Sequence, residues 1–133
     1  MKKVFLEAHN IKNPYNGFGQ FNFHLIKGLY NAEISDFKIT LNVKDKSPLQ
    51  AMYGNYFSYN KYTQRSRIPL FRVRKKFDVW HCLNQNIKVE PYHDLPYLLT
   101  VHDVNFVNEV SNDMNHKVNR RFQNKLNRSS AIT

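Results

Sequence analysis

The fold is decided by the stretch Leu95-Pro96-Tyr97-Leu98-Leu99-Thr100-Val101-His102-Asp103-Val104-Asn105-Phe106. Pro96 cannot donate a hydrogen bond to a sheet, so it suits the start of a strand. The run from Tyr97 to Val101 is apolar and short, which is typical of a strand buried on both faces of a parallel sheet. It ends at His102-Asp103. Ligands of open α/β sheets bind at the carboxyl ends of strands, so this pair is either a site or an ordinary turn with a hydrogen-bonded histidine.

Further strands are predicted on both sides of this one in the chain. Lys3–Ala8 and Phe37–Val43 are strand-like, and Phe77–Leu83 is a buried strand followed by Asn84-Gln85-Asn86. Amide side chains both donate and accept hydrogen bonds, so they suit recognition of sugar hydroxyls, and they equally suit a turn. The last residues, 130–133, look like the opening of another strand. The segment 57–63 fits either a strand or a loop.

A glycine-containing turn follows the first strand. Gly17-Phe18-Gly19 closes a polar loop, and apolar residues then recur at helical spacing, which predicts a helix from about Gly19 or Gln20 to Asn31. Glycine lets the backbone approach an anion, and the free N–H groups of a helix start point at it. Asn22 stands where the third glycine of a dinucleotide-binding loop would be, which argues against that fold. Two glycines in an ordinary loop are the plain alternative.

Two more helices are expected. Pro48 suits the first turn of a short helix within 47–53. Ser111-Asn112-Asp113 supplies capping residues for a helix ending near Arg128, in which Val118, Phe122 and Leu126 form a narrow apolar stripe. The cations Lys117, Arg120, Arg121, Lys125 and Arg128 are expected on its remaining surface. This basic helix either covers the sheet or lies near a membrane surface.

Composition narrows the class of protein. The chain has 133 residues, enough for one domain, and a net charge of +10, which predicts an anionic partner. The segment 61–76 carries seven basic residues and no acid, so it is either a solvated basic face or a patch facing an anion. Cys82 is the one cysteine, which excludes an internal disulfide and fits a reducing, cytoplasmic compartment. No apolar run is long enough to cross a bilayer.

Together these elements predict an α/β fold: a Rossmann-like three-layer domain with a mostly parallel sheet flanked by helices. We expect residues 1–133 to form a single domain that is cut off within a larger architecture, because the final strand lacks the loop and helix that should follow it.

In this order the elements resemble the N-terminal, acceptor-side domain of family 4 retaining glycosyltransferases, which have the GT-B fold. The resemblance covers nearly the whole chain. It consists of the Gly17-Phe18-Gly19 loop and its helix, of Asp78-Val79-Trp80-His81 as the "D-V-x-H" strand, of Leu99-Thr100-Val101-His102-Asp103 as the "T-x-H-D" strand, and of the basic helix leading to Ser129-Ser130-Ala131-Ile132-Thr133. The C-terminal donor-binding domain of the family, with its paired glutamates, has no counterpart in the chain.

The resemblance implies a role for each matching residue. His102 would be the catalytic residue beside the transferred sugar, and Gly17, Phe18 and Gly19 would bind the donor phosphates. The acceptor would be bordered by His81, Asn84, Gln85, Asp103 and Asn105, with Asp103 positioning its loop rather than doing chemistry. No metal is demanded, and the sequence has no clustered carboxylates to hold one; no cofactor is expected, and the nucleotide sugar is a substrate.

The function implied is that of the acceptor-binding half of a glycosyltransferase, which moves a sugar from a nucleotide sugar to a glycan or lipid-linked acceptor. Such a half would be inactive without a donor domain. It would be cytoplasmic and could lie on the inner face of the membrane, against an anionic surface. The alternative is a basic nucleic-acid-binding module, although no nucleic-acid motif is present and that partner is the less expected.

Overall fold

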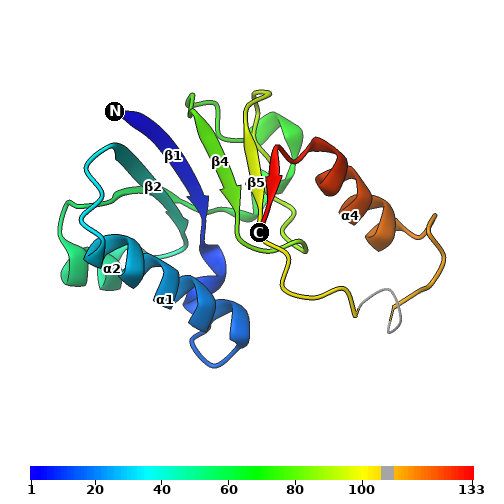
Figure 1. Cartoon of the computed structure of the whole chain (residues 1–133), viewed down its shortest axis with the longest axis horizontal. Helices are drawn as coiled ribbons and strands as arrows, with labels where there is room; N and C mark the ends of the chain where they lie inside the picture. The colour runs from blue at the N-terminus through cyan, green and yellow to red at the C-terminus, as the bar shows by residue number, and fades with distance from the viewer. Residues whose placement is uncertain (106–109) are drawn as a thin grey trace.

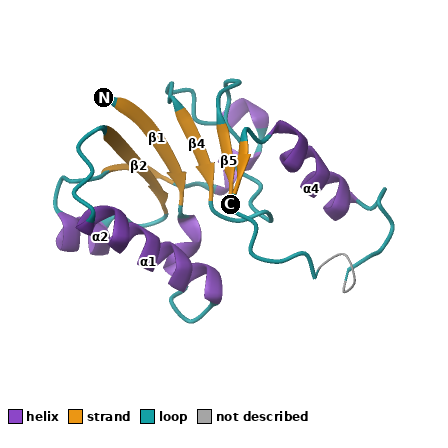
Figure 2. Cartoon of the chain, in the orientation of Figure 1, coloured by secondary structure: helices purple, strands orange, loops and turns teal. Residues whose placement is uncertain are grey.

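The computed structural model describes residues 1–105 and 110–133 as an α/β domain with one parallel sheet (Figures 1 and 2). The six strands lie in the order β3-β2-β1-β4-β5-β6, and every neighbouring pair is parallel. The strands are β1 (Lys2–Glu7), β2 (Phe37–Val43), β3 (Ser58–Lys61), β4 (Val79–Cys82), β5 (Tyr97–Leu99) and β6 (Ala131–Ile132), and the helices are α1 (Gly17–Asn31), α2 (Ser47–Tyr53) and α4 (Lys117–Arg128). This is the strand order of doubly wound dinucleotide-binding domains. The predicted Rossmann-like fold class is therefore confirmed.

Both faces of the sheet are buried, because successive side chains of a strand point to opposite faces. Leu6 of β1 and Leu41 of β2 join the core under α1 and α2, which also contains Ile26 of α1. Phe5 of β1 and Trp80 of β4 belong to a second core, on which α4 packs. Figure 1 shows α1 and α2 beside β1 and β2, and α4 beyond β5. This arrangement gives the expected three layers.

The central strands lie where the sequence places them. β2 and α2 have the predicted bounds. β5 begins at Tyr97 as predicted but ends at Leu99 rather than Val101, and β4 covers only Val79–Cys82 of the predicted strand Phe77–Leu83. The last strand is confirmed as β6, which pairs with β5 through Leu98 and Leu99. The segment 57–63, for which the sequence allowed a strand or a loop, contains the edge strand β3. Phe106, the last residue of the deciding stretch, lies outside the described residues.

Helix α1 begins at Gly17, two or three residues earlier than predicted. Asn16 is its N-cap: the side-chain oxygen of Asn16 accepts a hydrogen bond from the Gly19 N–H at 2.7 Å. An asparagine at this position satisfies one of the N–H groups that have no partner inside the helix. The cap therefore draws both glycines into the first turn.

The start and the buried face of α4 differ from the prediction. The helix begins at Lys117 with His116 as N-cap, because Asp113 instead accepts the Asn115 N–H in a local turn. Asn119 holds that turn against the helix by donating to the backbone oxygen of Asp113. Lys125 was expected on the solvent-facing basic surface, yet it is only 2% exposed. The Lys125 prediction was wrong because the partly buried Glu90 pairs with this lysine.

Candidate site at the carboxyl edge of the sheet

The carboxyl ends of β1 and β4 are neighbours, with Glu7 paired to Cys82 in the sheet register. The chain leaves β1 toward β2 on one side and reaches β5 from β4 on the other, so the strand order reverses at this point. Ligands of open α/β sheets bind in the crevice outside such a reversal. A cavity of about 310 Å³ lies there, lined by His9, Asn10, Phe18, Arg67, Asn84, Asn86, Ile87 and Lys88. We call it the switch-point crevice.

The His102 imidazole packs against the first turns of α1, next to this crevice. Its ring centre lies 5.0 Å from that of Phe18 and 4.6 Å from that of Phe21, both in edge-on contacts. His102 Nε2 is 2.8 Å from the Leu83 carbonyl oxygen. A carbonyl can only accept, so Nε2 carries a proton and Nδ1 is the nitrogen left for a ligand. The histidine and the glycine turn, which are far apart in the sequence, are thus brought together.

Gln85 fixes the loop that carries His102. Its side chain is 2% exposed and uses both ends: Oε1 accepts the His102 N–H at 3.2 Å, and Nε2 donates to the Asp103 carbonyl at 2.7 Å. Asp103 accepts the Asn105 N–H at 3.1 Å, which closes a turn of exposed residues. Gln85 therefore positions the histidine, while Asp103 and Asn105 remain accessible.

Of the three residues predicted to bind the donor phosphates, Gly17, Phe18 and Gly19, two have a free backbone N–H group. The Gly19 N–H is held by Asn16, whereas those of Gly17 and Phe18 have no hydrogen-bond partner among the described residues. A Cβ atom at Gly19 would lie 1.8 Å from the Asn13 carbonyl oxygen, while one at Gly17 would meet nothing within 4 Å. Gly19 therefore permits close backbone packing, and the N–H groups left free at the helix start are those of Gly17 and Phe18.

Asn84 and His81, the last two predicted site residues, lie in different places: Asn84 lines the crevice and His81 does not. Asn84 is 3% exposed and lines the switch-point crevice. Its Oδ1 accepts the Asn86 N–H at 2.8 Å, so its amide nitrogen is the group left to donate. His81 does not line the crevice; its Nε2 lies 2.9 Å from Thr100 Oγ1, across β4 and β5. Burial lowers the pKa of His81 to about 4.

The depressed pKa of His81 predicts a loss of stability in acid. Above pH 6.5 the ring is neutral in both states, but between pH 6.5 and about 4 only the unfolded chain takes up the proton. The free energy of unfolding should therefore fall by about 3 kcal/mol over this interval. Urea unfolding of the wild type and of His81→Gln at a series of pH values measures it. The variant should lose less stability on acidification, and parallel curves would contradict the assignment.

Sequence reasoning missed a buried carboxylate–histidine pair at the end of β1. Glu7 is fully buried, and its Oε1 lies 2.6 Å from His9 Nδ1. The other Glu7 oxygen accepts a hydrogen bond from the Asn42 side chain at 2.5 Å. The His9 ring stacks on Tyr62 at 4.1 Å and borders the switch-point crevice. The available signal was that an acid and a histidine lie two residues apart where the first predicted strand ends, since β1 ends at Glu7 and a 3-10 helix begins at His9.

The crevice is lined by cations, and one of them comes from the basic segment 61–76. Arg67 reaches it, with its Nε donating to the Tyr62 hydroxyl at 3.0 Å, and Lys88 lines another wall. Other cations of the segment lie over aromatic rings, as Arg74 does 5.0 Å from the centre of Tyr92. The segment 61–76 therefore contributes one cation, Arg67, to the lining of the switch-point crevice.

Comparison with protein-family models, with curated proteins and with solved structures finds no match to this chain. Within residues 1–105 and 110–133, no group of three or more His, Cys, Asp or Glu side chains could hold a metal ion. In the same residues, no helix combines the length and the apolar character needed to cross a membrane. The functional argument therefore depends on the geometry of the carboxyl edge.

Proposed function

We propose that this domain is the acceptor-binding half of a glycosyltransferase, which transfers a sugar from a nucleotide sugar to a glycan or lipid-linked acceptor. The observation that supports it best is the contact of His102 with Phe18 at the start of α1. This contact puts an imidazole beside the free N–H groups of Gly17 and Phe18, at the edge where open α/β sheets bind ligands.

The two parts of the site suit the two charges of glycosyl transfer. As the sugar leaves its nucleotide, negative charge grows on the departing phosphate, and a helix N-terminus with free N–H groups stabilises such charge. Arg67 and Lys88 in the crevice add positive charge. His102 Nδ1 can accept a hydrogen bond from a hydroxyl of the transferred sugar, because Nε2 is fixed on the Leu83 carbonyl.

The acceptor side is the polar wall of the crevice. Asn84 offers an amide donor, and Asp103 and Asn105 are exposed on the adjacent turn. Hydroxyl groups both donate and accept, so a mixture of amides and a carboxylate suits a glycan acceptor. In this proposal a second domain delivers the nucleotide sugar, the transfer retains the configuration of the sugar, and no metal takes part. The enzyme would work in the cytoplasm, at or near a membrane surface.

An NMR titration of the ¹⁵N-labelled chain tests this. Uridine diphosphate should shift the amide signals of Gly17 and Phe18 and the ring signals of His102, whereas uridine alone should not. A Gly17→Pro variant, which removes one free N–H at the first helical position, where proline is tolerated, should weaken the response severalfold. Unmoved signals at all three residues would overturn the proposal.

Two control measurements address its other parts. Turnover of a nucleotide sugar by the isolated chain would contradict the half-enzyme role. Tight binding of single-stranded oligonucleotides with a steep dependence on salt would instead favour the nucleic-acid-binding alternative.

A further inference from the structure

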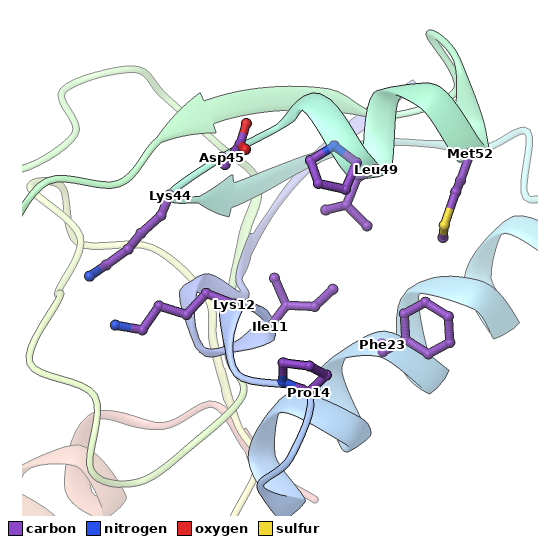
Figure 3. A pocket seen from close by; sticks show the side chains of 9 residues that line it. Ile11, Lys12, Pro14, Phe23, Lys44, Asp45, Leu49 and Met52 are labelled. Carbon is purple, nitrogen blue, oxygen red and sulfur yellow. The ribbon is translucent and has the colours of Figure 1, made fainter.

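A second cavity, of about 360 Å³, lies beside α1 and opens next to α2 (Figure 3). Most of its wall is apolar and comes from three segments of the chain. The lining side chains are Ile11, Pro14, Phe23, Pro48, Leu49 and Met52, together with the charged residues Lys12, Lys44 and Asp45. We call it the α1–α2 groove. Its apolar part is wide enough to show as an open space between Phe23, Ile11 and Leu49 in Figure 3.

The charges of this groove are gathered at one end. Figure 3 shows the Lys12 and Lys44 side chains extending side by side, away from the apolar lining. The proximity of Lys12 lowers the pKa of Lys44, and Arg67 lowers it further. Like charges this close repel each other. The groove therefore has an apolar body and a strongly cationic mouth.

Nothing in the described residues neutralises this mouth. Neither Lys12, Lys44 nor Arg67 forms an ion pair within residues 1–105 and 110–133. Asp45 is the one acid of the lining, and its carboxylate is turned away in Figure 3, where it accepts the Ser47 N–H at 2.9 Å. An anion at this mouth would form charge-assisted hydrogen bonds with cations that no acid of the described residues engages.

Two of these cations are organised by one buried aromatic residue. Lys44 Nζ lies 5.5 Å from the centre of the Tyr62 ring, and Arg67 Nε donates to the Tyr62 hydroxyl at 3.0 Å. Tyr62 is 4% exposed and stacks on His9, so its ring is fixed. Tyr62 therefore orders Lys44 at the mouth of the groove and Arg67 in the neighbouring switch-point crevice.

We infer that the α1–α2 groove binds the phosphate monoester of a long-chain alcohol, with the phosphate at Lys12 and Lys44 and the chain along the apolar wall. A phosphate monoester carries close to two negative charges at neutral pH, which matches a pair of ammonium groups. The wall beyond them offers no charge to a second polar group, so the rest of the ligand is apolar. If the proposed function holds, on which this reading depends, the groove holds the lipid-phosphate end of a lipid-linked acceptor, while the end that receives the sugar lies against the polar wall of the switch-point crevice.

Isothermal titration of the full chain with short, monomeric amphiphiles tests the inference. The probes are inorganic phosphate, butyl phosphate, octyl phosphate and octanol, each below the concentration at which it aggregates. Affinity should rise from phosphate to octyl phosphate by up to about fourfold per methylene group, the gain expected for burying each one. Octyl phosphate should bind at least tenfold more tightly than octanol. Equal affinity for octyl phosphate and inorganic phosphate would overturn the inference.

Variants locate the two ends of the ligand. Lys12→Met and Lys44→Met should each weaken octyl phosphate at least fivefold and leave octanol unchanged. Phe23→Ser should weaken octyl phosphate and leave inorganic phosphate unchanged, with its fold checked by circular dichroism. Lys46→Met is the matched control, because Lys46 is exposed on the same loop but does not line the groove. Wild-type binding by both lysine variants, or an equal loss in Lys46→Met, would contradict the assignment.

This experiment uses no nucleotide, so its failure can be told apart from failure of the proposed function. If octyl phosphate binds but the signals of Gly17 and Phe18 do not respond to uridine diphosphate, lipid-phosphate binding in the groove is supported and the proposed glycosyltransferase function is refuted. If uridine diphosphate shifts these signals but octyl phosphate does not bind, the glycosyltransferase function is supported and lipid-phosphate binding in the groove is refuted.

Discussion

Gly19→Ala is expected to destabilise the domain by more than about 3 kcal/mol. The new Cβ atom would lie 1.8 Å from the Asn13 carbonyl oxygen and 3.2 Å from that of Asn10. Both of these neighbours are backbone atoms, so the clash cannot be relieved by a side-chain rotation and requires α1 to move away from the loop after β1. Forced overpacking usually costs about 1–3 kcal/mol, and a rigid backbone contact belongs above that range. Urea unfolding followed by circular dichroism measures the change.

Gly28→Ala is the matched control, because Gly28 lies in the same helix. A Cβ atom there would meet nothing within 4 Å, and the residue is exposed. Alanine favours the helix over glycine by about 1 kcal/mol, so this variant should be more stable than the wild type. Gly19→Ala as stable as Gly28→Ala would show that α1 does not pack on the loop as described. The contact matters for function because that loop carries His9 and Lys12.

Much of the fold could be predicted because the pattern of apolar residues is local. β2 alternates polar and apolar residues, and Pro48 marks the first turn of α2, so both elements have the predicted bounds. β3 was left open because Ser58–Lys61 is a polar edge strand, whose pairing with β2 no sequence period reveals. The start of α4 was misplaced because Asp113, which can cap a helix, forms a local turn instead.

The candidate site was predictable where it depends on topology. His102 was placed at the end of a parallel strand, and parallel strands end at one edge of a sheet, which is also where the turn before α1 lies. Gly19 and Gln85 were predicted to bind ligands, but both hold the structure of the site instead. Their hydrogen bonds to Asn16 and His102 form only in the folded chain, so the sequence does not show them.

The main error of the sequence-based prediction was to miss the charged side chains that are buried, and this error has a physical reason. A charged side chain is assigned to the surface by default, since burial requires a partner whose position only the tertiary structure supplies. Glu7 is buried against His9 and Asn42, and Lys125 against Glu90. For Lys125 the signal was its position, since it lies three residues after Phe122 and therefore on the same side of α4 as the apolar stripe.

The second large effect is expected at the Lys125 ammonium group, which is enclosed under α4. Its Nζ donates to Glu90 Oε1 and to the Tyr97 hydroxyl, the latter at 3.0 Å, and it lies 3.6 Å from Cys82 Sγ. Glu90 also accepts from Arg128 at 2.6 Å, so the acid bridges a buried and an exposed cation. Burial raises the pKa values of Tyr97 and Cys82, which keeps both neutral at pH 7. Among residues 1–105 and 110–133, Glu90 is therefore the acid that balances Lys125.

Glu90→Gln should destabilise the domain by about 3–4 kcal/mol, because it leaves a buried ammonium group without a counter-charge. Lys125→Met should cost about 1 kcal/mol or less, since it replaces the buried charge by an apolar chain of similar length and leaves Glu90 paired with Arg128. The double variant should be more stable than Glu90→Gln alone, because methionine removes the unbalanced charge. Urea unfolding of all three at pH 7 gives these differences. If Lys125→Met is as damaging as Glu90→Gln, the lysine contributes packing or hydrogen bonds that its charge does not explain, and the assignment of Glu90 as its balancing acid is wrong.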